Sequence, residues 1–409
     1  PVATDDLYCQ HDRLMSPLAW DLGHIGNFEE LWGVRSVPGG SEVHPELDAI
    51  YDATLNPRAT RAELPLPDLQ TYRTTLAVIR ARLLEERKRL VGSDDPLIAD
   101  DFVYHMLAQH EFQHNETMLQ TLQLKGGDSY HPMIERRALP QGDAALVGAF
   151  VDFDGGEGLI GTDRRAGVYD NERPAHSREL APFSLAAVPV TNGEYLAFVE
   201  DGGYRQQELW DPTGWSFLQQ ESIVAPKHWH YIAGGWFEMT MDRVDPLDLL
   251  RPVIHVCYYE AEAYCRWSGT RLPTEFEWEH AARSGLSSQE DQPLYPWGTD
   301  QWTDLHANLD MAGWGTAPVG AFPRGATPHG LHQMIGDVWE WTASPFTPWP
   351  GFSAYPYDEY SKIFFGDDYR VLRGGSWATR PGAIRTTFRN WDYPIRRQIF
   401  AGFRLARDR

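Results

Sequence analysis

The sequence changes character near residue 140, and this change constrains the fold more than any other feature. Before it, apolar residues recur at helical spacing. After it, glycine, proline and aromatic residues become frequent, and short apolar runs are separated by turn residues. One architecture does not satisfy both patterns, so we predict two domains, over residues 1–143 and 144–409. At 409 residues, the chain is long enough for each domain to bury a core of its own.

The first domain is predicted to be a bundle of four antiparallel helices. Ser16 and Pro17 are typical of a helix start, in which a capping side chain precedes proline at the first helical position. Two longer amphipathic helices are expected over 68–91 and roughly 98–124. A short helical segment before Asp12 would complete the bundle.

The second domain is predicted to be of the α+β class and rich in loops. Apolar runs such as FSLAAVPVT and RVLRGGSW suit short strands, and one helix is expected over roughly 259–269. The acidic and aromatic segment 343–368 is expected to be a long loop. Loops of that length are usually functional, so this segment is a candidate part of a site.

Charge and cysteine content limit the partners and the compartment. The 58 acidic residues against 36 basic ones give a formal net charge of -22, which argues against nucleic acid as a partner. We expect no membrane span, because no apolar run reaches about eighteen residues. Cys9, Cys257 and Cys265 give neither a disulfide framework nor a zinc-binding spacing, so a reducing cytoplasm is expected.

Three histidines of the first domain form a candidate metal site. His110 and His114 are four residues apart on the stripe of their helix that should face the core, and can chelate one ion. His24 lies about 40° from the apolar Phe28 on its own helix, so it is the best third ligand. His11 and His105 are poorer candidates. Three imidazoles without a thiolate suit zinc, iron or copper equally well.

Two other functions remain open from these residues alone. The segment HEFQH (110–114) satisfies the zinc-peptidase pattern H-E-x-x-H, in which Glu111 would activate a metal-bound water. Against this reading, Thr117 stands where the extended form of that pattern has glycine. The histidines could also be structural, in a binding module without catalytic activity.

The motifs of the second domain resemble the formylglycine-generating-enzyme (sulfatase-modifying-factor) domain, which implies a C-type-lectin-like fold. They are NERPAH (171–176), PVTN (189–192), RLPTEFEWEHAAR (271–283), YPWG (295–298), GLHQMIGDVWEWTAS (330–344), RVLRGGSW (370–377) and GFRLAR (402–407). The chain departs from the oxidase members of this family, because Leu405 follows GFR where a copper-binding cysteine is expected. We therefore do not expect this domain to oxidise sulfatase cysteines.

The motifs WDLGHIGNFEELW (20–32) and HEFQHNETMLQ (110–120) resemble the DinB-like bundle of the ergothioneine-biosynthesis sulfoxide synthases (the EgtB family). The resemblance implies that His24, His110 and His114 hold a non-haem Fe(II). It also implies the reaction. These enzymes use O2 to join a thiol sulfur to C2 of the imidazole of N-α-trimethylhistidine (hercynine), and they leave the sulfur as a sulfoxide.

The same resemblance implies residues that bind the substrates. Arg58 and Arg61 would grip carboxylates of γ-glutamylcysteine, although free cysteine remains open as the thiol donor. Gln113 and Asn390 would bind hercynine, and Asp392 would take the amino group of the thiol substrate.

Aromatic residues complete the implied site. Trp391 could face the trimethylammonium group, whose charge is best met by an aromatic ring. Tyr357 is expected to be the catalytic acid, and Tyr360 to line the trimethylammonium site. Tyr355 is close enough in the sequence to be the alternative acid.

Overall fold

The computed structural model describes residues 2–126, 130, 132–133, 135–286, 293–298 and 301–409. The chain divides into two compact units. The first, which we call the helical unit, comprises Pro1–Met133 and Arg164–Val168. The second, the mixed unit, comprises Ile134–Asp163 and Tyr169–Arg409.

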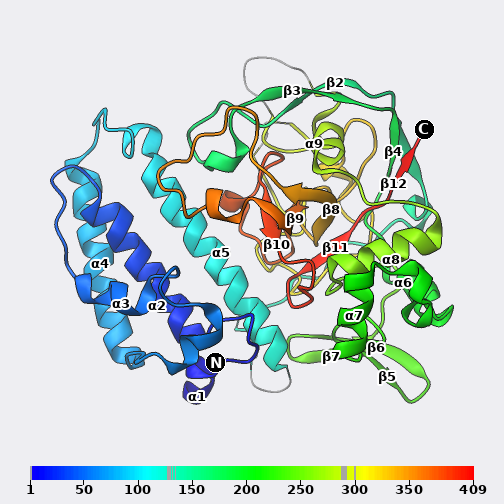
Figure 1. The fold of residues 1–409 in the computed structure, drawn as a ribbon, viewed down its shortest axis with the longest axis horizontal. Helices are drawn as coiled ribbons and strands as arrows, with labels where there is room; N and C mark the ends of the chain where they lie inside the picture. Colours follow the sequence, from blue (N-terminus) through cyan, green and yellow to red (C-terminus); the bar gives the residue numbers. More distant parts are fainter. Residues whose placement is uncertain (1, 127–129, 131, 134, 287–292, 299–300) are drawn as a thin grey trace. The chain divides into compact units, whose positions relative to one another are not determined.

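The helical unit is built on three long helices, of which α2 packs against both others (Figure 1). Its helices are α1 (Thr4–Tyr8), α2 (Leu18–Glu30), α3 (Asp48–Tyr51), α4 (Leu69–Arg89) and α5 (Phe102–Lys125). A π-helical segment, Leu31–Arg35, continues α2. Short 3-10 segments cover Pro45–Leu47, Arg58–Glu63 and Ala99–Asp101. The helices expected over 68–91 and 98–124, and the short one before Asp12, are confirmed.

The start of α2 differs from the prediction. Pro17, not Ser16, occupies the N-cap position, and no side chain caps this helix. Ser16 instead accepts a hydrogen bond from Arg61 at 2.7 Å, so its hydroxyl is engaged away from the helix end. In contrast, the Asp68 carboxylate accepts a hydrogen bond from the backbone N–H of Thr71 and caps α4.

Small residues let the helices of this unit approach closely. A Cβ atom at Gly26 of α2 would lie 2.1 Å from Cδ2 of Leu76 on α4, so a larger residue there would displace the Leu76 side chain. Trp20 of α2, Ile79 of α4 and Val103 of α5 are fully buried. Trp20 packs in a cluster with Ala19, Tyr51 and Tyr72.

The mixed unit contains several small sheets. The largest has the strand order β10-β9-β8-β11, and these strands cover Asn390–Asp392, Gly366–Arg373, Trp339–Phe346 and Ala401–Phe403 in that order. Strand β11 is parallel to β8, and the other neighbouring pairs are antiparallel. A second sheet is antiparallel, with the order β1-β4-β12 (Phe150–Phe153, Phe183–Ala186, Ala406–Asp408). The hairpin β2-β3 covers Gly156–Ile160 and His176–Leu180, and the sheet β5-β6-β7 covers Trp229–Ile232, Gly235–Thr240 and Arg243–Pro246.

Four α-helices accompany these sheets. They are α6 (Asn192–Glu200), α7 (Pro212–Gln220), α8 (Tyr258–Ser268) and α9 (Glu275–Arg283). Helix α8 confirms the helix expected over 259–269, whereas the other three were not predicted. The expected long loop is shorter than 343–368, because β8 extends to Phe346 and β9 begins at Gly366.

Buried ion pairs connect the sequence motifs of the mixed unit that resemble the formylglycine-generating-enzyme domain. Arg404 of GFRLAR bonds Glu340 at 2.8 Å, and Arg373 of RVLRGGSW bonds Glu279 at 2.6 Å. All four side chains are almost fully buried. Removing one partner of such a pair leaves an uncompensated charge in the core, so these motif residues hold the fold together.

The described part of the chain contains no helix that combines the length and the apolar character required to span a membrane.

Candidate metal centre

The structure brings the three predicted histidines together in the helical unit. His24 projects from α2, and His110 and His114 project from α5. One ring nitrogen from each lies within 4.8 Å of those from the other two. The Nε2 atoms of His24 and His110 are 3.2 Å apart. Imidazoles at this separation can share one metal ion, so the cluster is a candidate metal site.

The orientation of His24 is set by a backbone carbonyl. Its Nδ1 lies 2.8 Å from the carbonyl oxygen of Tyr51. A carbonyl only accepts hydrogen bonds, so Nδ1 carries the proton and the lone pair of Nε2 faces His110. Tyr51 reaches this position because its ring lies against α2 at Gly23, where a Cβ atom would be 2.2 Å from Cζ of Tyr51. The hydroxyl of Tyr51 is bonded to that of Tyr72 at 2.6 Å.

The orientation of His114 is set by a carboxylate. Its Nδ1 lies 3.0 Å from Oδ1 of Asp21, whose side chain is only 1% exposed. A proton on Nδ1 leaves Nε2 of His114 with its lone pair, as a metal ligand requires. Sequence reasoning missed Asp21, although its place in WDLGH, one helical turn before His24, was a usable signal.

Burial keeps two of the imidazoles neutral. Desolvation lowers the pKa of His24 and of His110 well below the usual value, and the nearby charge of His114 lowers both further. The rings are also stacked, His24 on Trp20 at 4.7 Å and His110 on Phe28 at 3.7 Å between centroids. Neutral, fixed and converging nitrogen atoms are a donor set that fits a divalent transition metal.

Of the two arginines predicted to bind substrate carboxylates, Arg61 is buried in the helical unit. Its side chain is 5% exposed, its Cζ lies 3.4 Å from the centre of the Trp20 ring, and its Nε bonds the carbonyl of Asn56 at 2.9 Å. Desolvation lowers the pKa of Arg61 to about 9, and the charge of Arg58 adds to the shift. Within the described residues, no carboxylate forms an ion pair with Arg61, although the charge of Asp21 acts against the lowering of its pKa. Arg58 is exposed.

Two residues next to the metal-site histidines of α5 were also singled out from the sequence, Glu111 for a zinc peptidase and Gln113 for binding hercynine. Glu111, which a peptidase would use to activate water, accepts a hydrogen bond from Arg80 at 3.1 Å. Gln113 is half-buried, one residue before His114.

In the mixed unit, four of the predicted substrate residues gather with aromatic neighbours. Trp391 of β10 stacks on Phe346 at 4.1 Å, and its edge contacts Tyr360 at 5.6 Å between ring centroids. The ring centroids of Tyr357 and Tyr360 are 6.3 Å apart. Asn390 precedes Trp391 on the same strand and accepts a hydrogen bond from the Trp391 backbone N–H at 2.9 Å.

Asp392, the third residue of β10, is held by its neighbours in the sequence. Its carboxylate accepts hydrogen bonds from Nε of Arg396 and from the backbone N–H of Tyr393, at 2.9 and 2.8 Å. These two contacts fix the position of the Asp392 carboxylate.

The loop that carries the tyrosines is fastened at two points by Asp170. One carboxylate oxygen accepts from the Ser361 hydroxyl at 2.5 Å, and the other accepts from the Tyr355 backbone N–H at 3.2 Å. Tyr357 and Tyr360 lie between these anchors. Tyr169, adjacent to Asp170, stacks on Tyr360 at 4.1 Å. Burial raises the pKa of Tyr357 well above its usual value, so its phenol keeps its proton.

The domain families agree with this architecture. Residues 136–409 match the sulfatase-modifying factor enzyme 1-like domain family, and residues 1–118 match the DinB superfamily. The fold and the three-histidine cluster therefore define a class of enzymes with a DinB-type helical domain, which carries a metal site, followed by an α+β domain of the formylglycine-generating type. The predicted fold class is confirmed.

Comparison with curated proteins identifies the family within this class. The hercynine oxygenase of Mycobacterium tuberculosis is 46% identical over 98% of this chain and 93% of its own length. That of Mycolicibacterium thermoresistibile is 45% identical over 98% and 90%. The inactive C-alpha-formylglycine-generating enzyme 2 of Mus musculus is 35% identical, over 63% of this chain and 85% of its own length. The chain belongs to the hercynine oxygenase family and is an oxidoreductase, as the motifs predicted.

Proposed function

We propose that this enzyme is an Fe(II)- and O2-dependent sulfoxide synthase, which joins a thiol sulfur to C2 of the imidazole of hercynine in ergothioneine biosynthesis. The observation that carries the proposal is the convergence of His24, His110 and His114 in a chain that matches hercynine oxygenases over 98% of its length. Atoms and electrons balance with O2 as the oxidant. One oxygen atom enters the sulfoxide, and the other leaves as water with the hydrogens of C2 and of the thiol.

The metal proposed for the three-histidine centre is ferrous iron. When bound, it would supply the redox chemistry toward O2 that zinc lacks. The Tyr51 carbonyl and the Asp21 carboxylate fix the tautomers of His24 and His114, so that Nε2 of each is free to bind the ion. Three protein ligands leave further positions for small molecules, so the reactants can be held as neighbours.

The arginines of the helical unit are proposed to bind the carboxylates of the thiol substrate. Arg61 is a buried cation without a carboxylate partner among the described residues, and its contacts with Ser16, Asn56 and Trp20 fix the position of its guanidinium. A substrate carboxylate would supply the charge that this site lacks. Arg58 is exposed and could bind a second carboxylate, which favours γ-glutamylcysteine over free cysteine.

Tyr357 is proposed to donate a proton from its phenol hydroxyl during the reaction. Its raised pKa keeps that proton in place at neutral pH, and Asp170 holds the loop on both sides of it. Asp170 is thus a positioning residue, since it acts through Tyr357.

Hercynine is proposed to contact aromatic and amide side chains. Tyr360 and Trp391 offer ring faces and edges to the trimethylammonium group, a contact worth about 0.5–2 kcal/mol. Gln113 and Asn390 would bind the rest of hercynine, and Asp392 would bind the amino group of the thiol substrate. The free thiols of Cys9, Cys257 and Cys265 suit a reducing cytoplasm as the site of action.

The proposal is tested by measuring O2 uptake while each component is omitted in turn. We expect uptake only when Fe(II), hercynine and a thiol are all present, and faster uptake with γ-glutamylcysteine than with cysteine. Arg58→Gln should remove most of the preference between the thiols, whereas the exposed control Arg13→Gln should not. Uptake that does not depend on hercynine, or hydrolysis of peptides with zinc, would refute the proposal.

A further inference from the structure

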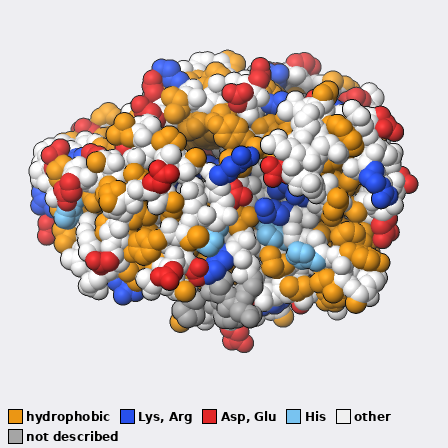
Figure 2. Space-filling model, turned by 60° about the horizontal axis from the view of Figure 1, so that its bottom comes forward, with side chains coloured by type: hydrophobic (Ala, Val, Ile, Leu, Met, Phe, Trp, Pro, Cys, Tyr) orange, Lys and Arg blue, Asp and Glu red, His pale blue; other side chains and the backbone are white. Residues whose placement is uncertain are grey.

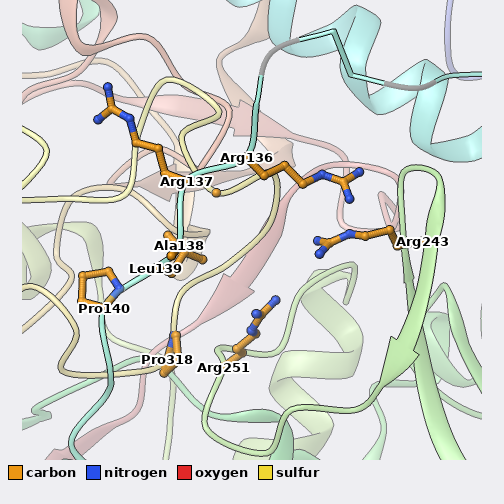
Figure 3. A pocket seen from close by; sticks show the side chains of 9 residues that line it. Arg136, Arg137, Ala138, Leu139, Pro140, Arg243, Arg251 and Pro318 are labelled. Atoms are coloured by element: carbon orange, nitrogen blue, oxygen red, sulfur yellow. The ribbon is translucent and has the colours of Figure 1, made fainter.

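The mixed unit contains a cavity of about 260 Å³ that the proposed function does not use. Figure 3 shows the guanidinium groups of Arg136, Arg243 and Arg251 converging there from separate segments of the chain. Leu139, Pro140 and Pro318 form apolar parts of the wall. Charged guanidinium groups beside an apolar wall are typical of a site that binds a small organic molecule.

Arg251 has unused hydrogen-bonding capacity. Its guanidinium donates no hydrogen bond to any described residue, its buried Nε included, and its contact with Asp248 is an ion pair with an Nε–Oδ2 distance of 3.2 Å. Arg243 donates one long hydrogen bond, of 3.3 Å, to the Trp314 carbonyl, and its buried Nε has no partner within the described chain. Donors buried without partners cost free energy, and an incoming acceptor removes this cost.

The residues that line the cavity carry positive charge without any acid. Each of the three arginines has an aspartate partner outside the wall: Arg136 pairs with Asp242, Arg243 with Asp245 at 3.5 Å, and Arg251 with Asp248 at 3.2 Å. Two buried acids, Glu238 and Asp337, have pKa values that respond to Arg251, and burial raises these pKa values to about 7 and about 6. Glu238 is therefore only partly ionised at neutral pH.

The arginines also repel one another. Burial lowers the pKa of Arg243, and the charges of Arg136 and Arg251 lower it further. The charges of Asp245 and Asp242 offset part of this repulsion. On the face drawn in Figure 2, acidic and basic side chains are interspersed. Like charges gathered around an apolar-walled cavity are stabilised by a bound anion.

We propose that this cavity binds a small organic carboxylate, held by Arg251 and Arg243 through its oxygens and by Leu139 and Pro318 through its carbon chain. A planar guanidinium matches a carboxylate in a bidentate geometry, which gives the site its chemical preference. The volume admits a molecule of a few carbon atoms. The site is independent of the proposed reaction, because it shares no residue with the metal centre or with the predicted substrate residues.

Calorimetric titration of the iron-loaded enzyme with succinate tests this proposal. We expect saturable binding that Arg251→Gln weakens by at least about tenfold, the loss of one charge-assisted hydrogen bond. The matched control is Arg137→Gln. Arg137 also lines the cavity, but its guanidinium points away from the other arginines in Figure 3 and pairs with Asp304 at 2.6 Å. This control should bind succinate as the unmodified enzyme does.

Two further measurements keep the result unambiguous. Arg251→Lys retains the charge and should bind with intermediate affinity, and circular dichroism must show that each variant is folded. Succinate could also bind at Arg61, so only the loss specific to Arg251→Gln counts as support. Equal binding by Arg251→Gln and Arg137→Gln would overturn the proposal, and so would tighter binding of inorganic phosphate than of succinate.

Discussion

Asp21 and His114 are joined by a hydrogen bond of 3.0 Å between a carboxylate oxygen and the imidazole Nδ1, and Asp21 is almost completely buried. A carboxylate behind a metal-binding imidazole fixes the ring and makes its other nitrogen a stronger base. In this enzyme the contact links α2 to α5, so the residue that precedes His24 by one turn also orients His114.

Asp21→Asn should therefore weaken metal binding. The neutral amide oxygen stabilises the Nδ1 proton less than a carboxylate does, and such changes typically reduce metal affinity by about 10- to 100-fold. Anaerobic titration with Fe(II) measures the dissociation constant directly. Asp94→Asn, at an exposed position, is the control and should bind iron normally. Unchanged affinity in Asp21→Asn would mean that this contact has no part in the metal site.

Tyr357→Phe should keep iron bound but lose most C–S bond formation. General acid catalysis typically contributes about 10²- to 10⁴-fold, and phenylalanine retains the ring without the proton. Product formation is measured by mass spectrometry at saturating substrates. Tyr355→Phe is the control, and normal activity is expected of it. If Tyr355→Phe is the inactive variant, the catalytic acid is assigned to the wrong tyrosine.

Asp170→Ala should lower both stability and turnover. It removes the acceptor of the Tyr355 N–H and of the Ser361 hydroxyl, and each buried donor left unpaired costs about 1–3 kcal/mol. Urea denaturation gives the free energy of unfolding. If Asp170 acts by positioning Tyr357, the double variant Asp170→Ala/Tyr357→Phe should be no slower than Tyr357→Phe alone. Additive losses in turnover would contradict this role.

Stability should fall in mild acid because of a buried histidine pair. Burial lowers the pKa of His255 to about 3, and that of His228 is also lowered, with Lys227 and Arg397 adding repulsion. A histidine with a depressed pKa in the folded state binds its proton only when unfolded, so stability is lost as the pH falls below about 6.5. His255 should contribute a loss of about 1 kcal/mol between about pH 7 and pH 5.5.

His255→Asn isolates this contribution. Asparagine tolerates the φ of 63° at this position and keeps a side-chain donor for the Arg397 carbonyl. Urea midpoints of the enzyme and the variant at both pH values give the difference. The variant should lose less stability in acid than the unmodified enzyme, and equal losses would show that His255 does not titrate on unfolding.

The features predictable from the sequence were those encoded locally. The spacing of His110 and His114 fixes their common face, because a helix repeats every few residues. Helices α6 and α9 were missed although each has a capping box, Thr191 with Glu194 and Thr274 with Glu277, which local reading could have found.

Other features depend on contacts between distant segments. Asp170 is separated by 185 residues from Tyr355 and by 191 from Ser361, so no spacing rule identifies it. Likewise, 164–168 joins the helical unit, where the Gly167 carbonyl accepts from Gln109 at 3.2 Å. The composition of 164–168 does not indicate that this segment packs with the helical unit. The boundary at 143/144 stays a prediction that limited proteolysis can test.

Anaerobic Fe(II) titration tests most directly whether His24, His110 and His114 hold one ferrous ion. The unmodified enzyme should bind one ion per chain, whereas folded His24→Ala should not bind iron stoichiometrically. Retention of one tightly bound ion by His24→Ala would contradict binding at these three histidines.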